Sequence, residues 1–280
     1  MLRVRDAAIR VRRFEHRGDA ALPGARRPVC VFLHGYPDTL RVFEPLAAAL
    51  AETHDALLFD WPGQGRSEDL GVYDPRERAA FLADLLDAAG IDEAVVVAHD
   101  MGVLPALAFA ERSPARVSKL VLAHALLDDD APVSLSIAIL RTARLYRHVL
   151  RRAPGLVFDR CMASFLAPGH ALSRAVLAEM RQDFVARREN IVSLCRAYDA
   201  ALPTFLASLA GPGATPVEIV WSDRGGHFPR AHAEALARRV HGARITIVPG
   251  APHWALAQGG PTQARIAALI RSGRGRPAGG

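Results

Sequence analysis

Short apolar runs alternate with amphipathic stretches along this chain, and the alternation limits the folds that it can adopt. The apolar runs lie at residues 28–34, 56–60, 94–98, 117–123, 217–221 and 245–248. Helical patterns lie at residues 40–51, 74–89, 102–112, 231–240 and 262–270. Neighbouring parallel strands need helical crossovers, so the pattern predicts an α/β fold with a mostly parallel, doubly wound sheet. Residues 8–14 alternate apolar and basic side chains, which predicts a half-buried edge strand.

The strand pattern stops in the middle of the chain. Between about residues 126 and 203 the sequence shows several amphipathic helical stretches, broken at two Pro-Gly pairs. We therefore predict an insertion of helices into one sheet domain. The predicted parts are residues 1–125, the first part of the core; 126–203, a helical cap; 204–272, the second part of the core; and 273–280, a disordered tail.

Composition fits a single large α/β domain of the cytoplasm. The chain has 280 residues, of which 50% are hydrophobic and 23% charged. No apolar run approaches the roughly 18 residues of a transmembrane helix, and the N-terminus lacks the apolar segment of a secretory signal. The three cysteines have no metal-ligand spacing, so reduced thiols and no metal are expected, and Cys30 is expected to pack in the core.

The formal charge of +6 raises the question of nucleic-acid binding. The arginines are spread over the whole chain, without interleaved aromatic residues or a recognised nucleic-acid module. We therefore expect no nucleic-acid partner and no membrane partner. A monomer or a homodimer is expected.

Asp100 is the residue most in need of an explanation. It stands where the apolar run 94–98 gives way to a helical pattern that begins at Gly102. A helix N-terminus favours a nearby anion, and the turn would expose the side chain at the carboxyl end of the sheet. The alternative is an ordinary helix N-cap.

Four motifs, in order, resemble the α/β-hydrolase family over about residues 28–272. They are His34-Gly-Tyr-Pro, Asp60-Trp-Pro-Gly-Gln-Gly-Arg-Ser67, Ala98-His-Asp-Met-Gly102 and Gly250-Ala-Pro-His-Trp254. The resemblance implies the α/β-hydrolase fold with a helical cap. The family's nucleophile motif is usually Gly-x-Ser-x-Gly, and here Asp100 takes the place of the serine. This feature resembles the branch that contains epoxide hydrolases and haloalkane and haloacetate dehalogenases.

The resemblance implies a mechanism without a cofactor. An ionised Asp100 would displace a leaving group from an sp³ carbon and form an alkyl-enzyme ester. His253 would activate the water that hydrolyses this ester. The backbone N–H groups of Tyr36 and Met101 would form the oxyanion hole.

The carboxylate that should orient His253 is displaced from its expected place. The family pattern after the strand at 217–221 would put an aspartate where this chain has Gly225, and the nearest acid is Asp223. Other members of the Asp-nucleophile branch place the acid after the preceding strand. There the chain has His124, followed by three aspartates at residues 128–130, which read more readily as a solvated turn. We predict Asp223, and a histidine without a carboxylate partner remains an alternative.

The residues after Asp100 and the side chains of the insertion indicate which leaving group Asp100 would displace. Haloalkane dehalogenases resemble this chain less, because Met101 stands where they carry a tryptophan and the insertion has none. Haloacetate dehalogenases carry arginines just after the nucleophile, where this chain is apolar. Epoxide hydrolases use lid tyrosines to bind the epoxide oxygen, and the insertion offers Tyr146 and Tyr198 as substrate-binding residues. Opening of an epoxide in a small, largely apolar substrate is therefore the predicted reaction.

Two other classes of function stay open. The same scaffold could serve cyclisation, elimination or lyase chemistry, with Asp100 as a general base and no covalent ester. A non-catalytic binding protein on the same fold is the third reading, against which the presence of both Asp100 and His253 counts.

Overall fold

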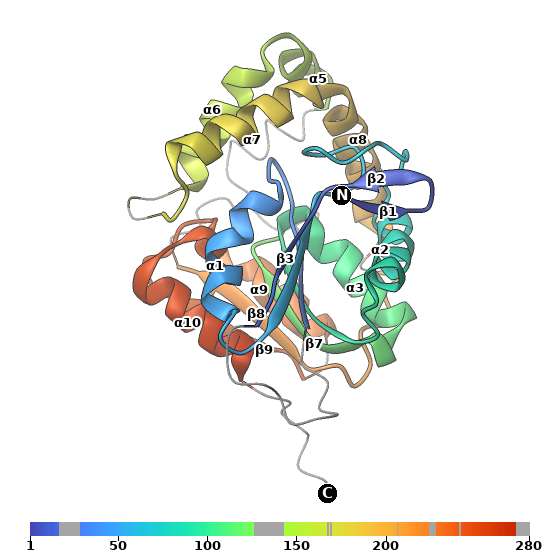
Figure 1. Ribbon diagram of the computed structural model, residues 1–280, viewed down its shortest axis with the longest axis vertical. Helices are drawn as coiled ribbons and strands as arrows, with labels where there is room; N and C mark the ends of the chain where they lie inside the picture. Colours follow the sequence, from blue (N-terminus) through green and yellow to red (C-terminus); the bar gives the residue numbers. More distant parts are fainter. Residues whose placement is uncertain are drawn as a thin grey trace, which may run out of the picture.

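A seven-stranded sheet forms the centre of the protein (Figure 1). The computed structural model describes residues 1–16, 29–125, 143–166, 168, 170–205, 207–223, 228–240 and 242–272. The strand order is β3 (Val11–Phe14), β5 (Asp55–Phe59), β4 (Val29–Leu33), β6 (Ala94–His99), β7 (Val117–Ala123), β8 (Val217–Ser222) and β9 (Arg244–Val248). β3 runs antiparallel to β5 at one edge, and all other pairs are parallel. The predicted doubly wound sheet is confirmed.

The N-terminal edge differs from the prediction of one strand over residues 8–14. The structure divides it into β2 (Ala7–Ile9), which pairs with β1 (Leu2–Val4), and β3. The strand is interrupted at Arg10. The N–H of Arg10 donates to Ser67 Oγ at 3.0 Å, and its carbonyl accepts from Asp60 N–H at 3.0 Å. The backbone of Arg10 is thus bonded to the loop after β5 instead of to a neighbouring strand.

Helices cover both faces of the sheet (Figure 1). One face carries α2 (Pro75–Ala89), α3 (Val103–Arg112) and α9 (Arg230–Arg239). The other face carries α1 (Glu44–Leu50) and α10 (Gly260–Arg271). The helix predicted at 40–51 begins as a 3-10 turn, Leu40–Phe43, before α1. Asp74 caps α2 by accepting from Arg76 N–H and Glu77 N–H, as its sequence position indicates.

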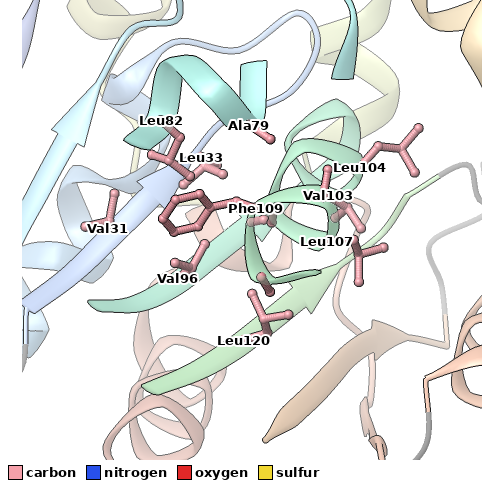
Figure 2. Packing of buried hydrophobic residues seen from close by; sticks show 14 of the residues in the cluster. Val31, Leu33, Ala79, Leu82, Val96, Val103, Leu104, Leu107, Phe109 and Leu120 are labelled. Atoms are coloured by element: carbon pink, nitrogen blue, oxygen red, sulfur yellow. The ribbon is translucent and has the colours of Figure 1, made fainter. Parts of the chain in front are cut away.

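The core has two layers because the strands are buried on both sides. In β4, Val31 and Leu33 face the α2 and α3 side, where Phe109 of α3 packs among them (Figure 2). Cys30 and Phe32 face the opposite layer, so the predicted packing role of Cys30 is confirmed. Strands buried on both faces read as continuous apolar runs, which is why the sequence located them well.

Four helices lie together at one end of the molecule (Figure 1): α5 (Ala143–Arg152), α6 (Pro154–Phe165), α7 (Arg174–Ala186) and α8 (Arg188–Phe205). They fall in the predicted cap, although α8 continues two residues past its predicted end at 203. Residues 126–142 and the predicted tail at 273–280 lie outside the described residues. None of the helices in the described part of the chain is long and apolar enough to cross a membrane.

Ion pairs join the cap to the core. Glu179 and Asp183 of α7 face three arginines of the core. Arg10 Nη2 lies 2.7 Å from Glu179 Oε1, Arg41 Nη2 lies 3.2 Å from Glu179 Oε2, and Arg66 Nε lies 3.3 Å from Asp183 Oδ1. These contacts fix α7 above the loops that follow β4 and β5.

Candidate active site

Asp100 occupies a sharp turn between β6 and α3. Its φ angle is +52°, in the left-handed region that non-glycine residues rarely adopt. Such a conformation costs of order 1–3 kcal/mol and persists only where the surrounding structure imposes it. No side-chain cap bond is made at the start of α3, so the structure does not support the helix-cap alternative.

Two glycines let the turn close. A Cβ atom on Gly102 would lie 2.4 Å from the carbonyl oxygen of Leu33, and one on Gly35 would lie 2.5 Å from Cβ of Asp100. Neither contact could be relieved by moving the end of a flexible side chain. The loop after β4 and the turn after β6 are therefore in direct backbone contact.

The two oxygens of the Asp100 carboxylate have different surroundings. Oδ1 accepts a hydrogen bond from Tyr36 N–H at 2.9 Å, and Met101 N–H also donates to the carboxylate. Oδ2 lies 3.8 Å from His253 Nε2. The two backbone donors predicted for an oxyanion hole thus converge on the carboxylate itself, and His253 lies on its other side.

Burial sets the protonation of Asp100. Only 12% of its side chain is exposed, and burial raises its pKa to about 6. Nearby Asp38 raises the pKa further, whereas His99 and the two N–H donors lower it. Asp100 is therefore mostly charged at neutral pH, and an ionised carboxylate can act chemically as a nucleophile or as a base.

His253 lies in the loop after β9 and is buried among rings. Its ring centroid is 4.7 Å from that of Phe165 in α6 and 5.4 Å from that of Phe228. His99 and His124 contact it from β6 and from the end of β7, at 4.9 and 5.4 Å. This packing leaves the imidazole few orientations.

Asp223 reaches the loop of His253 without bonding its ring. Asp223 Oδ1 accepts from Gly250 N–H at 2.6 Å, which anchors the start of the loop that carries His253. Within the described residues, no hydrogen bond joins Asp223 to His253. The competing aspartates at 128–130, and Gly225, lie outside the described residues. The assignment of Asp223 as the orienting acid stays a prediction.

His124 directly follows β7, at the second position considered for an orienting acid. Ser222 N–H donates to His124 Nε2 at 2.9 Å, so the ring proton must lie on Nδ1. Burial lowers the pKa of His124 well below its usual value. A neutral imidazole therefore stands at this position.

The two predicted lid tyrosines have different partners. The hydroxyl of Tyr146 in α5 contacts the hydroxyl of Tyr36, whose ring packs edge-on against Phe184 of α7. The hydroxyl of Tyr198 in α8 instead donates to the carbonyl oxygen of Met101 at 2.7 Å. Tyr198 is thus engaged with the backbone of the Asp100 turn. The phenol of Tyr36 was missed in the sequence, where only its backbone was assigned a role.

Two residues of the recognised motifs are structural. His34 Nε2 accepts from Trp61 N–H at 3.1 Å, and burial lowers the pKa of His34 to about 3. Asp60 accepts from Leu40 N–H and Arg66 N–H. These bonds tie the loops after β4 and β5 to each other and hold the backbone of Tyr36 in place. Among the described residues, no group of three or more His, Cys, Asp or Glu could hold a metal ion.

Comparison with known proteins agrees with the fold and with the motifs. Residues 28–259 match the model of the alpha/beta hydrolase fold family. The chain belongs to this family. A 2-hydroxy-6-oxononadienedioate/2-hydroxy-6-oxononatrienedioate hydrolase of Klebsiella pneumoniae is 25% identical over 245 residues, which cover 83% of each chain. Epoxide hydrolase 1 of Caenorhabditis elegans is 32% identical over 98 residues, 34% of this chain and 24% of that protein.

A solved structure of similar fold is a thermophilic esterase from Thermogutta terrifontis. It superposes with a TM-score of 0.72 at 20% identity, over 95% of this chain and 92% of that one. Family membership and the curated relatives together support hydrolase activity for this α/β-hydrolase.

We predict that Asp100→Asn stabilises the protein at neutral pH. Burial raises the folded-state pKa of Asp100 from 3.8 to about 6, so the ionised carboxylate carries a penalty that is full above pH 6. The penalty fades as the pH falls through the folded-state value toward the unfolded one. The free energy of unfolding should rise by about 3 kcal/mol at pH 7.5 and by only about 1 kcal/mol at pH 4.5, measured by urea unfolding.

Asp84→Asn is the matched control for this stability measurement. Asp84 is 44% exposed in α2 and pairs with Arg5. Its replacement should give no gain at either pH. An equal or smaller stability of Asp100→Asn at pH 7.5 would contradict the account of a strained, buried charge.

Proposed function

We propose that the protein is an epoxide hydrolase-like enzyme that uses Asp100 as its nucleophile. The observation that carries the proposal is the division of the carboxylate into two sides. Oδ1 accepts from Tyr36 N–H, Oδ2 faces His253, and Met101 N–H also donates to the carboxylate. A helix cap or a relic of a lost serine would need no such division.

The proposed first step is attack on carbon. Asp100 Oδ2 forms a bond to one epoxide carbon while the bond between that carbon and the epoxide oxygen breaks. The oxygen becomes an alkoxide and takes a proton from the phenol pair of Tyr36 and Tyr146. One hydroxyl of this pair donates its proton to the hydrogen bond between the two hydroxyls, and the proton of the other hydroxyl can be donated to the alkoxide.

The proposed second step is hydrolysis of the ester. His253 Nε2 accepts a proton from water as the water oxygen attacks Cγ of Asp100. Negative charge then develops on Oδ1, which already accepts from Tyr36 N–H; Met101 N–H also donates to this carboxylate. The bond from Cγ to Oδ2 breaks, and Oδ2 leaves in the diol with the proton that His253 took from the water. The water oxygen remains in the Asp100 carboxylate, and the second proton of the water returns to the phenolate of the tyrosine pair.

The remaining expectations belong to this proposal. Asp223 is the acid that orients His253, and its bond to Gly250 N–H holds the loop of that histidine. Tyr198 belongs to the substrate-binding residues, and its hydroxyl bonds the carbonyl of Met101. A cap over residues 126–203 covers a core made of 1–125 and 204–272 and encloses a small, largely apolar substrate. No cofactor takes part. The protein acts in the cytoplasm as a monomer or a homodimer.

A second candidate is non-hydrolytic chemistry with Asp100 as a general base. One observation favours it. Burial raises the pKa of Asp100 to about 6, which suits a base at neutral pH. A dehalogenase is favoured less, because Met101 lacks the ring N–H donor that would hold a departing halide.

The covalent step predicts a trapped intermediate. In His253→Gln the ester should form but not hydrolyse, since no base activates water. Incubation with a panel of epoxides should then add the mass of one epoxide to the protein, detected by intact-protein mass spectrometry. The double variant His253→Gln/Asp100→Asn, incubated in parallel, should gain no mass. Absence of an adduct with every epoxide and alkyl halide, together with turnover of another substrate, would contradict the proposal.

The phenols predict a separable effect on the first step. Tyr146→Phe removes a partner of the proton-donating pair, so formation of the ester should slow by roughly 10²-fold, as is usual for loss of a general acid. Stopped-flow measurement of tryptophan fluorescence after mixing with the epoxide follows this step. Tyr198→Phe is the matched control, because its hydroxyl bonds Met101 and not the phenol pair. A greater loss in Tyr198→Phe than in Tyr146→Phe would reverse the assigned roles.

A further inference from the structure

The histidine directly before the nucleophile connects three loops of the site. His99 is the last residue of β6, and only 1% of it is exposed. Its Nδ1 lies 3.2 Å from Asp38 Oδ2, in the loop after β4. Its Nε2 lies 3.2 Å from the carbonyl oxygen of His253, in the loop after β9. Neither contact is used in the chemistry described above.

Both partners of the His99 ring are hydrogen-bond acceptors. A backbone carbonyl can only accept, so Nε2 must carry a proton. Asp38 Oδ2 also faces Gly35 N–H at 3.3 Å and accepts from it, as a carboxylate oxygen does. A neutral imidazole has one N–H and could satisfy only one of its two partners. With Asp38 as an ionised acceptor, both contacts are satisfied when each ring nitrogen carries a proton.

We propose that His99 is a buried imidazolium, paired with Asp38, that keeps Asp100 ionised and fixes the carbonyl of His253. His99 is a positioning residue and touches no substrate. The proposal holds whether Asp100 attacks carbon or only moves protons, so it does not depend on the epoxide chemistry.

Charge balance gives the reason for such a pair. Asp38 is buried, only 12% of the Asp100 side chain is exposed, and the charge of Asp38 raises the pKa of Asp100. Within the described residues, His99 is the basic side chain that pairs with Asp38. The other titratable groups around the ring are His124 and His253, at 6.0 and 4.9 Å, and His34, which burial keeps neutral.

The pKa shifts agree with the hydrogen-bond geometry. Burial alone lowers the pKa of His99, but the hydrogen bond to Asp38 and the charges of Asp38 and Asp100 outweigh it and raise the pKa above its usual value. In return, His99 is the largest influence that lowers the pKa of Asp100. The cation thus offsets part of the burial penalty on the nucleophile.

The protonation of His99 can be observed directly by nuclear magnetic resonance. In protein labelled with ¹⁵N-histidine, the His99 ring is assigned as the signal missing from His99→Gln. At pH 8 the wild type should show two slowly exchanging ring N–H groups on this one residue. Asp38→Asn should lose one of them. A single ring N–H on His99 of the wild type at pH 8 would overturn the proposal.

The effect on Asp100 is measured without a substrate. Its pKa is followed through the ¹³Cγ signal in aspartate-labelled protein, assigned with Asp100→Asn. His99→Gln should raise the Asp100 pKa by about one unit or more, because the charge of Asp38 is then unbalanced. His99→Gln/Asp38→Asn should bring it back toward the wild-type value, although two buried residues have been changed.

A purely structural role would give a different pattern. The Asp100 pKa of the double variant would then lie no closer to the wild-type value than the Asp100 pKa of His99→Gln does. His232→Gln, which removes another buried histidine from α9, should leave the Asp100 pKa unchanged. An unchanged Asp100 pKa in His99→Gln would also overturn the proposal. None of these readings depends on turnover of an epoxide, so failure of the proposed function would leave the test intact.

Discussion

The site depends on a carboxylate held in a place where it is costly to keep. Asp100 has a left-handed backbone, is almost fully buried, and lies close to a second buried acid, Asp38. The compensation comes from the loop after β4, whose Tyr36 N–H bonds Oδ1, and from His99. Gly35 and Gly102 exist at their positions because any side chain there would collide with this arrangement. Most of the recognised motifs therefore help to hold the Asp100 carboxylate in this position.

A pair of phenols joins α5 to the loop after β4. Tyr146 comes from α5, whereas Tyr36 belongs to the core loop whose N–H bonds Asp100 Oδ1. Tyr36 thus contributes its backbone to the Asp100 carboxylate and its side chain to the contact with α5. Ion pairs of Glu179 with Arg10 and Arg41 and of Asp183 with Arg66 hold α7 against the core. The position of α5 and the surroundings of Asp100 are therefore linked through Tyr36.

The sequence predicted the sheet well and the site in part, for physical reasons. Strands buried on both faces leave continuous apolar runs, and β7 was located to the residue. The edge at residues 8–14 was predicted less well, because Arg10 bonds a loop that is distant in sequence. Which phenol meets which partner depends on packing between the cap and the core, and so Tyr198 and Tyr146 looked equivalent. The contact of Asp38 with His99 was not predicted either, because it joins the loop after β4 to the end of β6, which are far apart in the sequence.

Oxygen exchange between solvent and Asp100 tests the covalent mechanism most directly. A single turnover of an epoxide, with enzyme in excess, is carried out in H₂¹⁸O. The product diol and the peptide that contains Asp100 are then analysed by mass spectrometry. If Oδ2 attacks carbon, the diol leaves with an enzyme oxygen and contains no ¹⁸O, while the Asp100 peptide gains ¹⁸O. A diol that carries ¹⁸O after one turnover, with an unlabelled Asp100, would contradict the covalent role and would make Asp100 a general base.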